Sequence, residues 1–245
     1  MDVIYDLLTA VDKIGAVTDL PMERRGGLDM PDVTSPFAIS LRNVTVVHHA
    51  EKHPALSNIT FEVAPGERVC VSGPSGSGKS TLADLLTGLI AQYEGAVQVN
   101  NFALRDIDLT YYRDHIAANG TSDDLFEGTL LDNIIIGNPK IRTTEAINAL
   151  EKVGLRDTVA AWQEGIDTQV ISEGQGFSAG MAHRIMIARC LVRNPRLMIL
   201  HDHFSSFTRK EKSELFRVVL SGQNGTVICF SNDPLVMAAC DRLII

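Results

Sequence analysis

The sequence contains little that would suit a membrane span, a disulfide framework or a nucleic-acid surface. None of its apolar runs reaches the roughly 18 residues of a membrane-spanning helix, and the acidic residues within MDVIYDLLTAVDKI make the N-terminus a poor signal peptide. Its four cysteines lack C-x-x-C spacing, which indicates buried thiols in a reducing compartment. Because the net charge is −8, the basic excess of a nucleic-acid-binding protein is missing and no such partner is expected.

What is present is the composition of an ordinary globular protein. Hydrophobic residues make up 45% and charged residues 21% of the 245 positions, so most of the chain is expected to fold. This length suits one large domain or two small ones. The sequence shows no internal repeat, which leaves its motifs to indicate the architecture.

The first part of the chain, residues 1–36, is expected to be an appendage to a compact domain that spans 37–245. Apolar residues at helical spacing in the first 14 positions predict an amphipathic helix. The stretch TDLPMERRGGLDMPDVTSP follows, and its glycine, proline and charge predict a linker.

The compact part alternates between strand and helix signals. Strands are predicted at 41–47, 59–63, 68–72, 96–102, 197–200 and 226–230, and helices at 79–90 and 209–220. Between about 125 and 191 the periodicity is mostly helical. Strand–helix–strand alternation at both ends of the domain predicts an α/β fold with a parallel sheet and helices on its faces.

The most specific motif is the stretch Gly73-Pro74-Ser75-Gly76-Ser77-Gly78-Lys79-Ser80, which meets the pattern G-x-x-x-x-G-K-[ST] in full. Its glycines allow backbone N–H groups to approach phosphate oxygens closely. Lys79 can reach the β- and γ-phosphates, and the Ser80 hydroxyl can ligate Mg²⁺. The helix that starts here, with Thr81 in its first turn, directs its positive end at the same anion. The motif therefore predicts binding of ATP or a closely similar nucleotide.

Four longer stretches carry a family resemblance that runs from about Leu41 to the end of the sequence. They are PALSNITFEVAPGERVCVSGPSGSGKSTLADLLTGL, LFEGTLLDNIIIGNP, EGIDTQV and RIMIARCLVRNPRLMIL. Together they resemble the nucleotide-binding domain of ATP-binding cassette (ABC) transporters of the exporter type. The resemblance implies a P-loop NTPase (RecA-like) core with an antiparallel β subdomain and an inserted α-helical subdomain at about 122–182.

The resemblance also implies cofactors and partners. The cofactors would be ATP and Mg²⁺, and the partners a second nucleotide-binding domain and the transmembrane domain of the same transporter. Residues 1–36 resemble the tail of an exporter's last transmembrane helix with its linker. The chain would then be a soluble fragment at the cytoplasmic face of a membrane. In the family two domains pair head to tail, so each site combines one chain's phosphate loop with the other chain's signature motif.

Several of the family's functional positions carry unusual residues here. His48 stands where an aromatic side chain usually stacks on adenine, and either stacking or an exposed polar turn fits a histidine there. Thr121 replaces the glutamine that contacts Mg²⁺ and water. The signature, usually L-S-G-G-Q, reads Phe177-Ser178-Ala179-Gly180-Met181. Ser178 and Gly180 are retained and could face a γ-phosphate across a dimer, whereas the methionine lacks the amide.

The acidic positions depart further from the family pattern. His201 replaces the aspartate on the Mg²⁺ side, and Asp202, our candidate catalytic residue, replaces the catalytic glutamate. Thr208 replaces the aspartate of the next loop, and Asn232 the histidine that senses the γ-phosphate. Mg²⁺ prefers oxygen ligands, and a carboxylate misplaced by about 1 Å can cost roughly 100-fold in rate. These departures predict ATP binding with weak or absent hydrolysis.

Some alternatives remain open from the sequence. His201 could form a bulge that moves Asp202 to the Mg²⁺ position, and His201-Asp202-His203 resembles a metal cluster by composition, although no third ligand is evident. The domain could also be a pseudo-ATPase regulatory module that uses nucleotide to control dimerisation or a partner. A small-molecule kinase is disfavoured because the 140–190 region resembles the approach to a signature helix rather than an arginine-rich lid.

Overall fold

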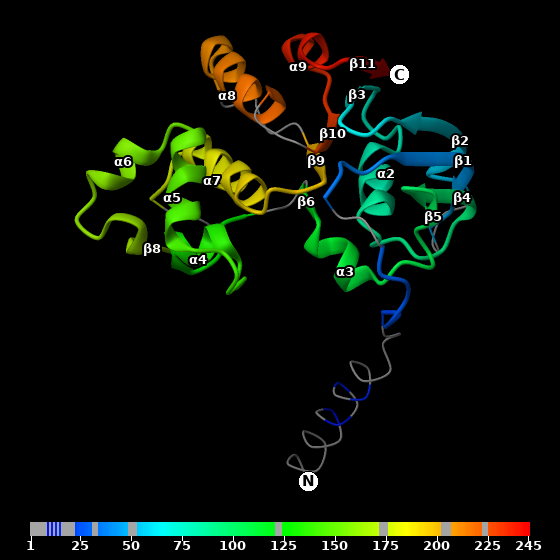
Figure 1. Ribbon diagram of the computed structural model, residues 1–245, viewed down its shortest axis with the longest axis horizontal. Helices are drawn as coiled ribbons and strands as arrows, with labels where there is room; N and C mark the ends of the chain where they lie inside the picture. The colour runs from blue at the N-terminus through cyan, green and yellow to red at the C-terminus, as the bar shows by residue number, and fades with distance from the viewer. Residues whose placement is uncertain are drawn as a thin grey trace.

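The computed structural model describes residues 9, 11, 13, 15, 23–30, 34–48, 53–120, 124–171, 176–201, 207–221 and 225–245. Figure 1 shows two lobes, one built on sheets and one built on helices, with the last two helices above the junction between them. Residues 9, 11, 13 and 15 are helical, and the other positions of the predicted N-terminal helix lie outside the described residues. None of the helices in the described ranges has the length and apolar character to cross a membrane.

An antiparallel sheet forms the outer part of the sheet lobe. Its strands are β1 (Ile39–Val46), β2 (Leu56–Val63), β4 (Glu94–Val99) and β5 (Phe102–Ala103), in the order β2-β1-β4-β5. The predicted strand at 96–102 was wrong at its end, because β4 and β5 form a hairpin. Its turn places Asn100 and Asn101 at φ of 48° and 68°, a left-handed conformation that asparagine tolerates well.

A parallel sheet of five strands joins the two lobes. Its strands are β11 (Arg242–Ile244), β3 (Arg68–Val71), β10 (Thr226–Phe230), β9 (Leu197–His201) and β6 (Ile116–Asn119), hydrogen-bonded in that order and all parallel. Every residue of β9 and β10 is buried. Along β10, Ile228 and Phe230 belong to one hydrophobic core, whereas Val227 and Cys229 belong to the other. Both faces are therefore covered, which explains the continuous apolar run of these strands.

The helix that follows the phosphate-loop motif, α2 (Lys79–Leu86), is shorter than the predicted 79–90. Thr87 is its C-cap, and Gly88 follows with a φ of 74°. A left-handed glycine just past the C-cap is a common way for a helix to end. Leu82, Leu85 and Leu86 bury one side of α2 in the core between the two sheets.

The second lobe contains most of the remaining helices. These are α4 (Leu130–Ile135), α5 (Thr143–Lys152), α6 (Arg156–Ala160), the 3₁₀ turn η1 (Gly165–Asp167) and α7 (Ala179–Val192), with the small hairpin β7 (Gly128–Thr129) and β8 (Gln169–Val170). Arg189 on α7 donates to the Asn133 carbonyl and side chain on α4. Asn133 is fully buried and also bonds Phe126. The predicted helical character of 125–191 is confirmed.

Three further helices lie near the parallel sheet. They are α3 (Leu109–Asp114), α8 (Arg209–Ser221) and α9 (Pro234–Ala239). None of the four cysteines, all within the described ranges, forms a disulfide; Cys240 is half-buried and the other three are buried, as their apolar surroundings predict. Residues 23–30 lie against the sheet lobe, where Leu28 pairs with Ile107 and Met30 is buried. The domain boundary near Phe37 stays a prediction.

The contact between α8 and α9 yields a prediction about stability. Lys212 Nζ lies 2.6 Å from Asp233 Oδ2, and both side chains are 16% exposed. The Lys212 ammonium lowers the pKa of Asp233 from its ordinary value. Lys212→Met should reduce the free energy of unfolding by about 1–3 kcal/mol at neutral pH, because it strands a half-buried carboxylate. The loss is full above the unfolded carboxyl pKa of about 3.9 and fades as the pH falls through the lowered folded value.

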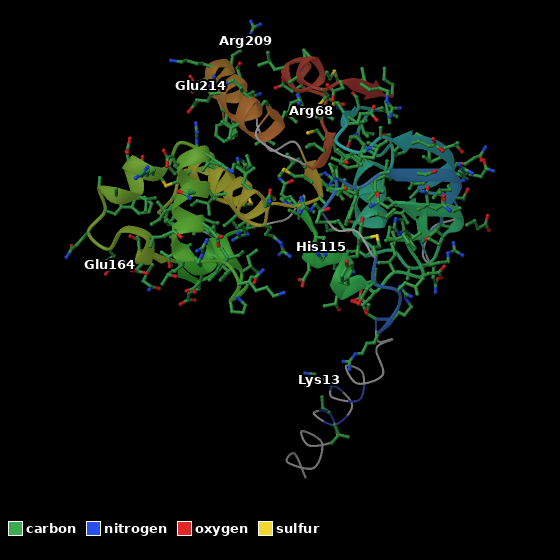
Figure 2. All side chains as sticks on the ribbon, in the orientation of Figure 1. Lys13, Arg68, His115, Glu164, Arg209 and Glu214 are labelled. Atoms are coloured by element: carbon green, nitrogen blue, oxygen red, sulfur yellow. The ribbon has the colours of Figure 1, made fainter. Side chains whose placement is uncertain are left out.

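Urea denaturation of both proteins across this pH range measures the effect. Lys210→Met is the matched control, because Lys210 pairs with Glu214 at 4.0 Å while 86% exposed. Figure 2 shows its neighbour Arg209 and Glu214 on the outer side of α8. An exposed helical pair contributes at most about 0.5 kcal/mol. Equal losses from both variants would contradict the role given to the Lys212–Asp233 pair.

Candidate functional site

The phosphate-loop motif connects β3 to α2 at the carboxyl end of the parallel sheet, the edge where ligands bind in such folds. Gly78 is the N-cap residue of α2, with a φ of 89°. A Cβ on Gly78 would lie 2.4 Å from the carbonyl oxygen of Ala55, so only glycine fits there. Gly76 also has a positive φ of 81°, but a Cβ there would meet nothing within 4 Å. The loop is thus packed on its inner side and open at Gly76.

Lys79 reaches back over the loop it follows. Its Nζ donates to the carbonyl oxygens of Gly73 and Pro74, both at 2.7 Å, and lies 3.4 Å from the Ser77 hydroxyl. These three oxygens are neutral, so the contacts hold the ammonium in place without cancelling its charge. The positive end of α2 lies beside it, and the two together suit an anion.

The next residues of α2 face outward as a nucleotide site requires. Ser80 is exposed, so its hydroxyl is available to a ligand. Thr81 Oγ1 lies 3.3 Å from Nε2 of His48, which follows β1. The structure therefore brings the predicted residue His48 to the first turn of the phosphate-loop helix, although the two residues are far apart in sequence.

Asn232, two residues after the neighbouring strand β10, holds the start of the phosphate loop. Its Oδ1 accepts from the Gly73 N–H at 3.1 Å and from the Ser72 hydroxyl at 2.8 Å, and its Nδ2 donates to the Gly73 carbonyl at 3.0 Å. A side-chain amide can satisfy a donor and an acceptor at once. Sequence reasoning identified Asn232 only as a departure from the family pattern and missed this contact.

His201 ends β9, two strands away from β3 in the sheet. Its ring is stacked on Phe230, with centroids 5.1 Å apart and planes 17° from parallel, and the residue is only 7% exposed. Its backbone N–H donates to the Asn119 side chain at 2.8 Å. An imidazole offers nitrogen rather than the oxygen that Mg²⁺ prefers. Two other predicted positions, Thr121 and Asp202, lie outside the described residues.

The signature residues lie at the start of α7, in the other lobe from α2 (Figure 1). Ser178 is exposed and caps α7, its Oγ accepting from the Met181 N–H at 3.3 Å. A Cβ on Gly180 would make only an ordinary contact with the Phe207 ring, at 3.6 Å. Packing within the chain therefore does not require glycine at this position. One chain by itself does not bring Ser178 and Gly180 to its own phosphate loop.

Thr208 has a clear local role at the start of α8. Its N–H and its hydroxyl donate to Oε2 of Glu211 at 2.9 Å and 2.7 Å. These bonds lower the pKa of Glu211, which also pairs with Arg184 on α7. The arrangement is a capping box, which fixes the first turn of α8.

These residues fit a polyphosphate better than they fit a metal. Positive-φ glycines, a lysine and a helix N-terminus converge on the phosphate loop. For Mg²⁺ the described part of the site offers the Ser80 hydroxyl. Within the described ranges no three histidine, cysteine or acidic side chains are grouped as metal ligands. The alternative interpretation of His201-Asp202-His203 as a metal cluster falls largely on residues outside those ranges.

Comparisons with known proteins agree with this geometry. The family model described as ABC transporter matches residues 56–205. The chain is 30% identical over 239 residues to an ATP-dependent lipid A-core flippase of Burkholderia orbicola, covering 97% of this chain and 40% of that protein. It is 28% identical over 238 residues to the alpha-hemolysin translocation ATP-binding protein HlyB of Escherichia coli O157:H7, covering 96% and 33%. The chain thus spans between a third and two fifths of these relatives.

A solved structure gives the same result for the fold. A bacterial Atm1-family ABC exporter with ATP bound superposes with a TM-score of 0.85 and 25% identity, covering 99% of this chain and 43% of that one. The predicted fold class, a P-loop NTPase core with an antiparallel sheet and helices, is confirmed, as is the exporter-type resemblance. Since the family model covers more than half of the chain, the chain belongs to the ABC transporter family and matches the ATP-binding domain of its exporters.

Proposed function

We propose that this chain is the ATP-binding domain of an ABC-type exporter that binds ATP and hydrolyses it slowly or not at all. The observation that carries the proposal is the contrast between the ends of β3 and β9, which lie on either side of β10 in the parallel sheet. The complete phosphate loop follows β3, with Lys79 held over it. At the end of β9, a stacked and buried imidazole, His201, takes the position of an acidic side chain.

Binding is assigned to groups that the phosphate loop supplies. Gly73 to Ser80 and Thr81 would hold the phosphates, mainly through backbone N–H groups and the Lys79 ammonium. Ser80 would give Mg²⁺ one oxygen, and the ion would neutralise phosphate charge when bound. His48, beside Thr81, is placed to contact the base. None of these roles depends on the departures at 201–202.

Hydrolysis needs catalytic side chains that this chain supplies poorly at the family's functional positions outside the phosphate loop. Phosphoryl transfer depends on positioning and on neutralising charge. We assign the remaining carboxylate, Asp202, as the catalytic group, and it is one methylene shorter than the family's glutamate. Losing a general base typically costs about 10²–10⁴ in rate. Thr121 stands in place of the family's glutamine amide, and His201 stands in place of its aspartate carboxylate.

The proposed partners are supported by the share of its relatives that the chain spans, between a third and two fifths. We propose a transmembrane domain of the same transporter, with residues 1–36 leading from it and residues 37–245 at the cytoplasmic face of the membrane. A cavity of about 400 Å³ lies where α2, β6, α7 and β9 meet. Leu89 and Ile136, which line it, are 66% and 52% exposed. We assign the transmembrane domain to this apolar rim, and a second nucleotide-binding domain to the exposed Ser178 and the half-buried Gly180.

The first test measures ATP binding and turnover by the purified chain. We expect binding without turnover, and Lys79→Ala should weaken binding at least tenfold, because charge-assisted bonds to phosphate contribute about 1.5–3 kcal/mol. Lys140→Ala is the control, since Lys140 is 84% exposed on the helical lobe. Calorimetric titration with ATP measures the affinity. A turnover of roughly 1 per second, within the ordinary enzyme range, would contradict the proposal.

The second test concerns the signature that this chain would lend to a partner. In a pair reconstituted with a competent partner domain, the double change Ala179→Gly and Met181→Gln should raise ATP hydrolysis by about tenfold or more, because it restores a polar group aimed at the transferring phosphate. Met181→Leu serves as the control, because it keeps the apolar packing of Met181 against the core without adding an amide. An unchanged rate in the double variant would count against the role given to FSAGM.

The third test concerns the contact between Asn232 and Gly73. Asn232→Ala removes three hydrogen bonds at the start of the phosphate loop, so the Kd for ATP should rise about three- to tenfold. Asn232→Asp loses the donor to the Gly73 carbonyl and places a negative charge beside the phosphate loop, so it should weaken ATP binding at least as much as Asn232→Ala. If Asn232→Ala binds ATP as tightly as the parent chain, the asparagine does not position the loop.

A further inference from the structure

The far end of the phosphate-loop helix is held by two consecutive residues of α3. The Tyr112 hydroxyl donates to the Leu86 carbonyl at 2.7 Å. Arg113 donates from Nε to the Thr87 carbonyl at 3.2 Å and from Nη2 to the Gly88 carbonyl at 3.0 Å. The last carbonyls of a helix have no partner within it and attract cations. Arg113 therefore supplies both the hydrogen bonds and the charge that this end of α2 requires.

The same guanidinium reaches the segment that precedes the domain. Its Nη1 and Nη2 donate to the two carboxylate oxygens of Glu23, at 2.8 Å and 2.7 Å. This fork-to-fork pair lowers the pKa of Glu23. Two residues before Arg113 on α3, Tyr111 donates from its hydroxyl to the Met30 carbonyl at 2.7 Å. Three consecutive side chains of α3 thus contact either the end of α2 or residues 23–30.

Residues 23–30 are closely packed against the residues that lead into α3. The Leu28 N–H donates to the Asp106 carbonyl at 2.7 Å, and the Asp108 N–H donates to the Leu28 carbonyl at 3.1 Å. A Cβ on Gly27 would lie 2.6 Å from the Asp108 nitrogen. Figure 1 shows this blue segment running past α3 before it enters β1. Residues 23–30 therefore pack in one defined position against the domain, which we call their seat. The ion pair between Arg113 and Glu23 holds the N-terminal end of this segment.

Arg113 also contacts the signature helix. Arg193, the C-cap residue of α7, donates from Nη2 to the Arg113 carbonyl at 3.0 Å. Arg113 thereby joins the preceding segment to the ends of two helices. The opposite ends of these helices carry the phosphate loop and the signature. Lysine could not replace it, because a single ammonium lacks the fork that spans a carboxylate and two carbonyls.

We propose that Arg113 is a positioning residue that couples the seating of residues 23–30 to ATP binding at the other end of α2. The ATP half of this inference rests on the proposed function. α2 has only eight residues, with the phosphate loop at one end and the Arg113 contacts at the other. A shift of one end therefore moves the other. By thermodynamic linkage, if a seated segment improves ATP affinity by some factor, bound ATP stabilises the seat by the same factor.

The first experiment uses the 245-residue chain without nucleotide. Glu23→Gln weakens the tie to Arg113, so amide hydrogen exchange over 84–90 and 23–30 should quicken about two- to fivefold, as for loss of one partly exposed ion pair. Glu62→Gln is the matched control, since Glu62 pairs with Arg42 at 3.2 Å and both are 66% exposed on the antiparallel sheet. Equal exchange over 84–90 in the two variants would overturn the link through Arg113.

The second experiment adds ATP and reads the coupling itself. In the parent chain, bound ATP should slow exchange over 23–30. In Glu23→Gln the Kd for ATP should rise about two- to fivefold, and Arg113→Lys should lose the ATP-dependent protection while Glu62→Gln keeps it. ATP binding with no change over 23–30 would overturn the inference. Absence of ATP binding would contradict the proposed function and, with it, the coupling of residues 23–30 to ATP. The exchange measured without nucleotide would still test whether Arg113 links residues 23–30 to the end of α2.

Discussion

Strands β3, β10 and β9 lie side by side, parallel and in register, and the arrangement of the site follows from this pairing. Cys70 pairs with Cys229, which in turn pairs with Leu200, so the three strands end at one edge of the sheet. The chain then leaves that edge as the phosphate loop, as Asn232 and as the segment after His201. Because both faces of the sheet are buried, a slip by one residue would move each side chain of a strand into the opposite core, where the packing is different. The register therefore places Asn232 within hydrogen-bonding distance of Gly73.

The features that could be predicted from the sequence are those whose local residue pattern fits only one kind of structure. The phosphate loop is such a pattern, because its glycines, lysine and serine are needed at fixed spacing. The strand at 197–200 is another, because a short, wholly apolar run suits a sheet that is covered on both faces. The hairpin at Asn100 was missed because two asparagines in the left-handed conformation resemble the polar end of a strand. The contacts of Asn232 and Arg113 were missed because their partners are distant in sequence, 159 and 90 residues away.

The two halves of the proposed activity differ in what they demand of the chain. Phosphate binding uses backbone N–H groups, a helix end and one lysine, and these depend on the fold. The space beside Gly78 admits no side chain, so the shape of the loop is maintained by packing against Ala55. Hydrolysis instead depends on side chains at strand ends, each of which can change without disturbing a core. His201 illustrates this, since its imidazole stacks on Phe230 and fits the sheet well. A chain can therefore lose hydrolysis while its fold and nucleotide grip persist.

The contacts at the two ends of α2 bear on what ATP binding can still do if hydrolysis is lost, as we propose. At the phosphate-loop end, Asn232 and Lys79 hold Gly73. At the other end, Tyr112 and Arg113 hold the last carbonyls and reach the segment before the domain. None of these contacts uses a carboxylate that hydrolysis would need. A ligand can shift a conformational equilibrium only through its different affinity for the two states, and that difference requires binding alone. The proposed route from nucleotide to residues 23–30 therefore does not depend on turnover. A domain with impaired hydrolysis, as we propose for this chain, needs such a route if ATP is still to act on the rest of a transporter.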